Sequence, residues 1–261
     1  MRERAGTAEI NEKRRVDRRR VDRRRVLILK MGSTLPSLRS RKGDFEDWIT
    51  SGLGLTREQV AVVDVSRGDP LPSLDAYSGI LITGSHSMVT DRLEWSERTA
   101  AWLTQAVNAG RPVLGICYGH QLLAHALGGE VGDNPEGQEL GTVDVELEET
   151  AWDDRLLSGL PARIRVHVGH TQSVLRLPPG AVRLASNRWD PNQAVRFSRT
   201  AWGVQFHPEF NAEIVREYIE HYRDVLSAEG QDPDRLMNTV TEERIGHTLL
   251  RRFAELMRAG A

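Results

Sequence analysis

The sequence predicts a three-layer α/β fold, in which a mostly parallel central sheet is flanked by helices. Short runs rich in valine, isoleucine and leucine alternate with amphipathic stretches through the first half of the chain. Such alternation is typical of parallel strands joined by helical crossovers. From about residue 140 the apolar runs become short and closely spaced, with turns such as Leu-Pro-Pro-Gly between them. This change predicts a small antiparallel extension of the sheet.

Four buried strands are expected in the first half, because each is a short apolar run bounded by turn residues. They are VLILK (26–30), VAVVDV (60–65), SGILITGS (78–85) and PVLGIC (112–117). Apolar residues at helical spacing predict helices elsewhere. The expected helices cover 45–53, 92–110, 118–129 and 208–228, with another inside 234–257. The aromatic residues Trp95, Trp102 and Tyr222 are expected to serve helix packing.

The N-terminal 25 residues are basic, whereas the rest of the chain is acidic. Residues 1–25 hold ten Arg and one Lys against five acidic residues, whereas the rest holds 24 basic and 32 acidic residues. The Arg-triplet repeat in this segment has too few apolar residues to pack, so we expect a disordered tail. A polyanion-binding arm is the alternative, but the acidic body argues against nucleic acid as a partner. Residues 26–230 are expected to form the α/β domain, and 231–261 a C-terminal helical extension packed on it.

Composition favours a cytoplasmic protein. No apolar run approaches the roughly 20 residues that span a bilayer, and VLILK is too short for a secretory signal. The chain has a single cysteine, Cys117, and therefore no intramolecular disulfide. We expect no membrane association.

The single cysteine lies in a distinctive pattern. Gly115-Ile116-Cys117-Tyr118-Gly119 has the form of a nucleophile elbow, where a strand turns sharply into a helix with the central side chain at the tip. The flanking glycines leave room for close backbone approach. A helix N-terminus also favours the thiolate form of a cysteine. These features predict that Cys117 is a nucleophile rather than a structural core residue.

A cysteine nucleophile needs a base, and the base needs an orienting group. The segment WGVQFHPEF (202–210) places His207 at the end of an expected strand and Glu209 two residues later. In extended backbone, residues two apart lie on the same side. Glu209 is therefore expected to bind one imidazole nitrogen and leave the other facing the sulfur.

GICYGHQ and FHPEF resemble the two signature motifs of class I glutamine amidotransferases, and the similarity extends in order over about residues 26–227. The resemblance implies the flavodoxin-like fold of that family, which agrees with the strand pattern. It also implies that Cys117 attacks a side-chain amide and forms a γ-glutamyl thioester. His207 would protonate the leaving ammonia and then activate water, while Glu209 holds the imidazole. The motifs resemble most the stand-alone members described as GMP-synthase-like.

The resemblance also implies groups that bind the substrate. The backbone N–H groups of Gly84 and Tyr118 would form the oxyanion hole, although Thr83-Gly84-Ser85 stands where many relatives have Gly-Gly-Pro. Gln121 corresponds to the glutamine-contacting Gln of the family. The segment VGHTQSV (168–174) resembles the one that holds the α-amino and α-carboxylate groups. Its candidates are His170, Thr171, Gln172 and Ser173, with Gln172 and Ser173 favoured.

The expected activity is that of a glutamine amidotransferase or γ-glutamyl hydrolase, with glutamine or a γ-glutamyl compound as substrate. No Gly-x-x-x-x-Gly-Lys-Ser/Thr segment and no second large domain is present, so we favour action without ATP. One alternative is a glutaminase subunit that supplies ammonia to a separate synthetase; another is a non-catalytic binding module. No cofactor and no metal is expected, because the histidine spacing fits no common zinc pattern.

Overall fold

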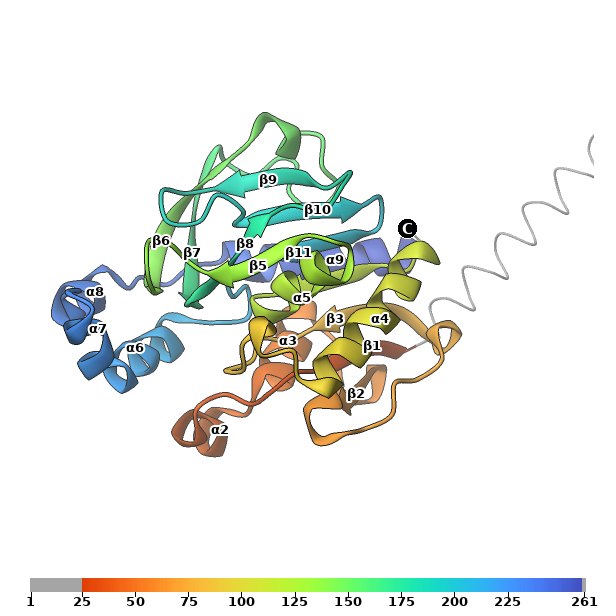
Figure 1. Cartoon of the computed structure of the whole chain (residues 1–261), viewed down its shortest axis with the longest axis horizontal. Coiled ribbons are helices and arrows are strands. Elements are labelled where there is room, and N and C mark those ends of the chain that lie inside the picture. Colours follow the sequence, from red (N-terminus) through yellow and green to blue (C-terminus); the bar gives the residue numbers. More distant parts are fainter. Residues whose placement is uncertain (1–24, 260–261) are drawn as a thin grey trace, which may run out of the picture.

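A nine-stranded mixed sheet runs through residues 25–259, the part of the chain that the computed structural model describes (Figure 1). Its strands, in spatial order, are β2 (Val60–Asp64), β1 (Arg25–Lys30), β3 (Tyr77–Ile82), β4 (Val113–Ile116), β11 (Ala201–Val204), β10 (Ala194–Ser198), β9 (Val182–Ser186), β6 (Glu139–Leu147) and β7 (Arg163–His170). The tail expected over residues 1–25 lies, apart from Arg25, outside the described residues.

The sheet has a parallel half and an antiparallel half. Strands β2, β1, β3, β4 and β11 are parallel to their neighbours, whereas β10, β9, β6 and β7 continue the sheet in antiparallel pairs. A separate two-stranded antiparallel sheet is formed by β5 (Glu130–Asp133) and β8 (Gln172–Arg176). The predicted fold class is therefore confirmed. The change in sequence texture near residue 140 marks the start of the antiparallel part.

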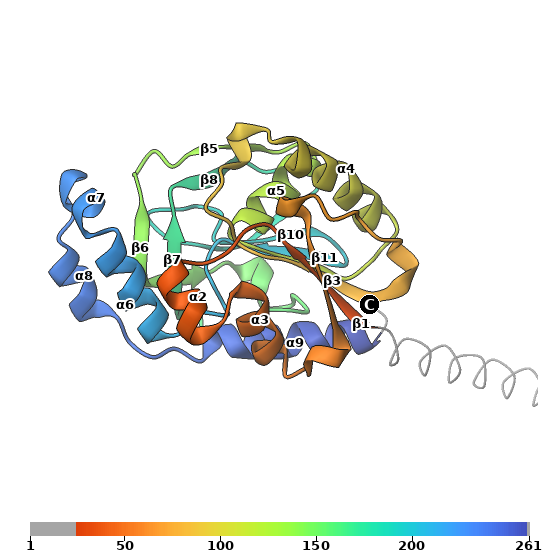
Figure 2. The same cartoon turned by 90° about the horizontal axis from the view of Figure 1, so that it is seen from below.

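Helices cover both faces of the parallel half (Figure 2). The helices of the described residues are α2 (Pro36–Lys42), α3 (Phe45–Leu53), α4 (Glu94–Asn108), α5 (Tyr118–Ala126), α6 (Ala212–His221), α7 (Arg223–Ala228), α8 (Pro233–Thr239) and α9 (Ile245–Ala259). Short 3₁₀ helices at 57–59, 65–67, 74–76, 89–91 and 149–151 lie in the connections. Helices α3 and α9 pack on one face, α4 and α5 on the other, and α6 and α8 contact β6 at the end of the molecule.

Strand β1 shows how the sequence builds these layers. Val26 and Ile28 belong to the core under α3 and α9, whereas Leu27 and Leu29 belong to the core under α4 and α5. Alternate residues of a strand point to opposite faces, so a continuous apolar run is required where both faces are covered. The run VLILK thus specifies a strand in the centre of a three-layer fold.

The C-terminal helices differ from the expected boundaries. The helix expected over 208–228 begins only after Asn211, whose side chain accepts a hydrogen bond from the N–H of Ile214, and it is divided at Tyr222 into α6 and α7. Within 234–257 there are two helices rather than one. Asp232 caps α8, and the chain leaves helical geometry at Val240 before α9 begins.

Helix α9 is part of the main core. Leu249, Leu250, Phe253 and Met257 are all buried beneath the sheet, and Phe253 contacts Trp202 of β11 edge to face. This apolar contact joins the C-terminal segment to the strand that precedes the FHPEF motif. Among residues 25–259, no helix combines the length and the apolar character required to cross a bilayer.

Candidate active site

Cys117 lies where β4 turns into α5, in the geometry expected of a nucleophile elbow. Its backbone has φ +50° and ψ −104°, and it is the N-cap of α5. Positive φ is unfavourable for a residue with a side chain and is kept only where the surroundings enforce it. The side chain is 5% exposed, and Sγ lies 3.7 Å from the carbonyl oxygen of Gly169.

The two flanking glycines are required by contacts with backbone. A Cβ at Gly115 would lie 2.4 Å from the carbonyl oxygen of Gly119, and a Cβ at Gly119 would lie 2.5 Å from the carbonyl oxygen of Ile82. Neither contact can be relieved by moving a side chain. The Gly-x-Cys-x-Gly spacing is therefore dictated by how closely α5 begins against β3 and β4.

Three neighbouring parallel strands carry Gly84, Cys117 and His207 just beyond their carboxyl ends. These strands are β3, β4 and β11, and β4 lies between the other two. A Cβ added to Gly84 would lie 3.1 Å from Cε1 of His207 and 3.9 Å from Cβ of Cys117. The three residues therefore meet at the edge of the sheet where open α/β sheets hold their ligands.

His207 is oriented by Glu209. Nδ1 of His207 and Oε1 of Glu209 are 2.8 Å apart, and both side chains are buried. Burial opposes protonation of His207, but the carboxylate of Glu209 and then the Cys117 side chain outweigh it and raise the pKa of His207 to about 10. The imidazole ring stacks on Phe210 with centroids 4.0 Å apart and an interplanar angle of 14°.

The predicted oxyanion donors also lie at this edge. Tyr118 is the first residue of α5, so its N–H is one of the helix groups without an intrahelical acceptor. Its phenol points elsewhere and bonds to Oγ of Ser96 across 2.6 Å. Gly84 follows β3 and borders both Cys117 and His207. Both N–H groups are thus near the sulfur, and their role as donors stays a prediction.

A cavity of about 180 Å³ opens beside Cys117. Of the predicted site residues, it is lined by Cys117, Tyr118, Gln121, His170, Thr171 and Gln172. His207, Glu209 and Gly84 do not line it. Ser173 also lies off the cavity wall: it is buried, and its hydroxyl accepts a hydrogen bond from Nδ2 of Asn134 across 3.0 Å. Direct contact between Ser173 and a substrate therefore has no support in this geometry.

The two glutamines are held by the protein itself. Nε2 of Gln121 donates to the carbonyl oxygen of Gln172 across 2.6 Å and to Oε1 of Gln205 across 3.1 Å. Nε2 of Gln172 donates to Thr90 and Asp133 across 2.7 and 3.0 Å. Oε1 of Gln172 is buried and has no hydrogen-bond partner within residues 25–259. It is an acceptor without a partner in the wall of the cavity.

A second imidazole–carboxylate pair, which the sequence does not predict, borders the cavity. Nε2 of His170 is 2.9 Å from Oε2 of Glu139, and both side chains are buried. Burial disfavours the imidazolium, but the hydrogen bond and charge of Glu139 outweigh it and raise the pKa of His170. Glu139 also accepts from Asn187 and Gln193. Nδ1 of His170 lies 3.0 Å from the carbonyl oxygen of Gln172, so both ring nitrogens are engaged within the protein.

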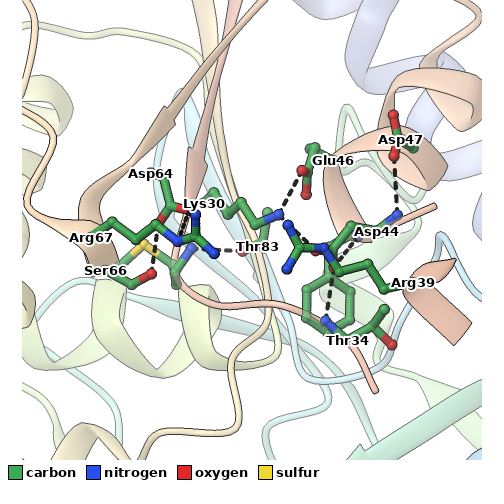
Figure 3. Close-up of polar contacts among 12 residues, drawn as sticks. Lys30, Thr34, Arg39, Asp44, Glu46, Asp47, Asp64, Ser66, Arg67 and Thr83 are labelled. Atoms are coloured by element: carbon green, nitrogen blue, oxygen red, sulfur yellow. Dashed lines mark hydrogen bonds and ion pairs between the residues drawn. The ribbon is translucent and has the colours of Figure 1, made fainter. Parts of the chain in front are cut away.

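A buried ion pair supports the loop next to the site (Figure 3). Nζ of Lys30, at the end of β1, lies 2.7 Å from Oδ2 of Asp44 and 2.6 Å from Oε1 of Glu46. Oδ1 of Asp44 accepts from the N–H groups of Thr34 and Phe45 across 2.8 and 2.9 Å. The pair thus fixes both loop 31–35 and the start of α3.

Several cavity residues were not predicted as parts of the site. They are Ser85, Gln138, Leu140, Gly169, Tyr218, Val225 and Glu229. Tyr222 was expected only to pack between helices, but it also lines the cavity, from its position between α6 and α7. Glu139 was missed as well, since one acidic residue in a strand gives no local signal. Within residues 25–259, no cluster of three or more His, Cys, Asp or Glu side chains is arranged to hold a metal.

The chain is similar in sequence and in fold to known proteins. A family model described as "Glutamine amidotransferase class-I" matches residues 42–220. The chain is 36% identical to the glutamine-hydrolysing GMP synthase of Aeropyrum pernix over 167 residues, which cover 61% of this chain and 31% of that protein. It therefore spans about a third of the length of that relative. It is 34% identical to a glutamine-hydrolysing GMP synthase subunit from Archaeoglobus fulgidus, over 60% of this chain and 82% of that protein.

Two further similarities come from a peptidase and a solved structure. The chain is 27% identical to gamma-glutamyl peptidase 3 of Arabidopsis thaliana, over 64% of this chain and 68% of that protein. The crystal structure of a glutamine amidotransferase from Thermotoga maritima superposes with a TM-score of 0.71 and 26% identity, covering 90% of this chain and 98% of that one.

Proposed function

The chain belongs to the class I glutamine amidotransferase family, and we propose that it cleaves the γ-amide of glutamine or of a γ-glutamyl compound through a thioester on Cys117. The observation that carries the proposal is the meeting of Cys117, on a strained elbow, with the buried His207–Glu209 pair. Nucleophile, base and orienting group in this order are the parts that cysteine acyl transfer requires.

The first half of the reaction forms the thioester. The Cys117 thiolate attacks the amide carbonyl carbon, and the oxygen of the resulting tetrahedral intermediate accepts hydrogen bonds from the N–H groups of Gly84 and Tyr118. The C–N bond then breaks as the imidazolium of His207 gives its proton to the departing nitrogen. Loss of one oxyanion donor typically costs about 3–4 kcal/mol of transition-state stabilisation.

The second half releases glutamate. His207, now neutral, takes a proton from water, and the hydroxide attacks the thioester carbonyl carbon. The C–S bond breaks, glutamate leaves as the γ-carboxylic acid and gives that proton to solvent water, and the thiolate is restored beside protonated His207. No ATP enters either half. Gln121, His170, Thr171 and Gln172 are the groups proposed to hold the glutamyl part, because they line the cavity next to Cys117.

Supply of ammonia to a separate synthetase is the second candidate. It is favoured by the similarity to the Archaeoglobus fulgidus GMP synthase subunit, whose length the alignment largely covers, and by the alignment with only a third of a complete GMP synthase. The similarity to a gamma-glutamyl peptidase favours hydrolysis by the chain alone. This second similarity is the reason that we prefer hydrolysis by the chain alone.

The test is covalent labelling combined with turnover. A diazoketone analogue of glutamine should add to Cys117 alone, as seen by intact mass and peptide mapping, and the label should be absent from Cys117→Ala. The purified full chain should release glutamate from at least one γ-glutamyl amide at an ordinary rate of about 1–10³ s⁻¹. Replacing His207 should lower turnover at least as much as replacing Glu209.

The two candidates and the binding-module alternative give different results. Slow turnover on every γ-glutamyl amide that rises on adding a co-purifying ATP-dependent protein would favour the ammonia-supplying role. A folded chain that neither takes the label nor hydrolyses any γ-glutamyl amide would contradict the thioester mechanism and leave a binding role.

A further inference from the structure

One wall of the cavity takes no part in the chemistry proposed above. It consists of Tyr218 on α6, Tyr222 between α6 and α7, Val225 on α7, and Glu229 just after α7. We call these four residues the α6–α7 wall. They come from the helices that lie at one end of the molecule, next to α2 and β6 (Figure 2). Such a wall must contact whatever part of the substrate lies away from the glutamyl-binding groups.

Loop 85–90 contacts both sides of the cavity. At one end of the loop, Nε2 of His86 lies 3.3 Å from the hydroxyl of Tyr218. At the other end, Sδ of Met88 lies 3.6 Å from Oγ1 of Thr171, and Thr90 accepts a hydrogen bond from Gln172. The segment proposed to hold the glutamyl part therefore contacts one end of the loop and the α6–α7 wall the other. A substrate whose glutamyl part lies against residues 170–172 would direct its leaving amine toward the α6–α7 wall.

The α6–α7 wall offers an aromatic and aliphatic surface. The rings of Tyr218 and Tyr222 have centroids 6.3 Å apart, at an angle of 30°. The Tyr218 hydroxyl is engaged by Oγ1 of Thr34 across 2.9 Å, and Thr34 is itself fixed by the Lys30–Asp44 pair, so this ring is held in place (Figure 3). Val225 is 47% exposed beside them. Covering these surfaces with an apolar group is favourable.

The charges around the cavity disfavour an acidic leaving group. Among residues 25–259, the cavity lining contains neither Lys nor Arg, and the carboxylate of Glu229 stands exposed at its rim. Burial, and then the charge of His207, lower the pKa of His86, so its imidazole supplies no positive charge at neutral pH. The pKa of His170 is raised by Glu139, but this imidazole lies on the glutamyl side of the cavity and is paired with that carboxylate.

We propose that the preferred substrates are γ-glutamyl amides of apolar amines, with an aromatic or branched group next to the amide nitrogen and no carboxylate on the leaving side. This substrate class rests on the function proposed above. Ammonia from glutamine leaves the α6–α7 wall uncovered. A leaving amino acid brings its carboxylate toward Glu229 without a cation to bind it.

The test uses the purified full chain and three substrates that share the glutamyl part: glutamine, γ-glutamyl-benzylamide and γ-glutamyl-phenylalanine. The measurement is kcat/KM from glutamate release. Wild type should favour the benzylamide over each of the others by about tenfold or more, the discrimination that an apolar pocket can supply. Tyr222→Ala and Val225→Ala should lower the benzylamide-to-glutamine ratio by about tenfold.

The charge on the α6–α7 wall is tested separately. Glu229→Gln should raise the ratio of γ-glutamyl-phenylalanine to benzylamide by about two- to fivefold, the size expected of a solvent-exposed charge interaction. Asp224→Asn is the matched control: Asp224 is an exposed carboxylate on the same helix and lies outside the cavity lining. It should leave every ratio as in wild type.

The outcomes separate this substrate class from the function on which it rests. Equal kcat/KM for the three substrates, or variants of the wall that change all three equally, would overturn the apolar-amine preference while leaving the thioester chemistry intact. A folded wild type that hydrolyses none of the three and fails to label Cys117 would overturn both. A thermal melt of each variant confirms that the ratios come from folded protein.

Discussion

The imidazole of His207 donates a hydrogen bond from Nδ1 to Oε1 of Glu209 across 2.8 Å, and both side chains are almost fully buried. Oε2 of Glu209 has no hydrogen-bond partner within residues 25–259. The charge of this carboxylate is thus directed at one imidazole. It fixes the proton on Nδ1 when His207 is neutral, and it stabilises the imidazolium.

Glu209→Gln should move the alkaline limb of the pH–rate profile to lower pH. The amide still accepts a hydrogen bond but supplies no charge, so the pKa of His207 falls from its value of about 10. Because protonated His207 must serve the leaving amine, activity is lost once that proton leaves. The measurement is kcat/KM for a γ-glutamyl amide between pH 6 and 10.5. An alkaline limb in the same place as in wild type would contradict the role of Glu209.

The same pair links His207 to folding stability. Its pKa in the folded chain lies above the ordinary value of about 6.5. The contribution to the free energy of unfolding is therefore complete below pH 6.5 and disappears as the pH rises through about 10. In Glu209→Gln this loss should still begin near pH 6.5 but should be smaller and should end at lower pH, which urea unfolding at a series of alkaline pH values would reveal.

Gly115→Ala should destabilise the fold and remove the reactivity of Cys117. The new Cβ would lie 2.4 Å from a backbone oxygen and 2.7 Å from the backbone nitrogen of His120, so α5 must shift. Overpacking of this kind costs about 1–3 kcal/mol or more. Gly169→Ala is the control for stability, since its Cβ would meet only a methyl group of Leu140 at 3.4 Å. Denaturant unfolding compares the two, and equal midpoints would refute the explanation given for the elbow.

Lys30→Met should lower the free energy of unfolding by up to about 3–5 kcal/mol, because the buried Asp44 carboxylate then keeps only the half-exposed Arg39 guanidinium, 3.3 Å away, as a cation. Adding Asp44→Asn should recover part of this loss. Arg163→Met, which breaks the exposed pair with Glu146, should leave the unfolding midpoint almost unchanged. Urea unfolding of the four proteins gives the comparison. A double variant less stable than Lys30→Met would show that Asp44 stabilises the loop mainly through its backbone hydrogen bonds.

His120→Leu should make the protein less sensitive to acid. Burial, and then the charge of His170, lower the pKa of His120 to about 3, and neither ring nitrogen has a hydrogen-bond partner within residues 25–259. The unfolded chain takes up this proton near pH 6.5, so wild type loses stability as the pH falls from 6.5 toward 3. Stability measured at pH 5 and pH 7.5 should differ less in the variant. His167, whose pKa is lowered to about 4, retains part of the slope.

The parts of the site that follow local rules could be predicted from the sequence. The Cys117 elbow depends on glycines two residues away, and the His207–Glu209 contact depends on extended backbone, so both leave short patterns. The contact of Tyr222 with the cavity depends on how α6 and α7 pack against the rest of the fold, which the local sequence does not reveal. Glu139 meets His170 only because β6 and β7 pair in one register. Such long-range pairing leaves no trace in the residues on either side.

The pairing of β4 with β11 also sets an order of events during synthesis. Residues 113–116 pair with residues 201–204, so the whole antiparallel half lies between the nucleophile and its base in the chain. Contacts between segments so distant in sequence form slowly compared with local ones. When Cys117 has just emerged from the ribosome, β11 and the imidazole of His207 have not yet been synthesised or folded beside it. The proposed acyl transfer therefore requires that translation has passed His207 and that β11 has entered the sheet.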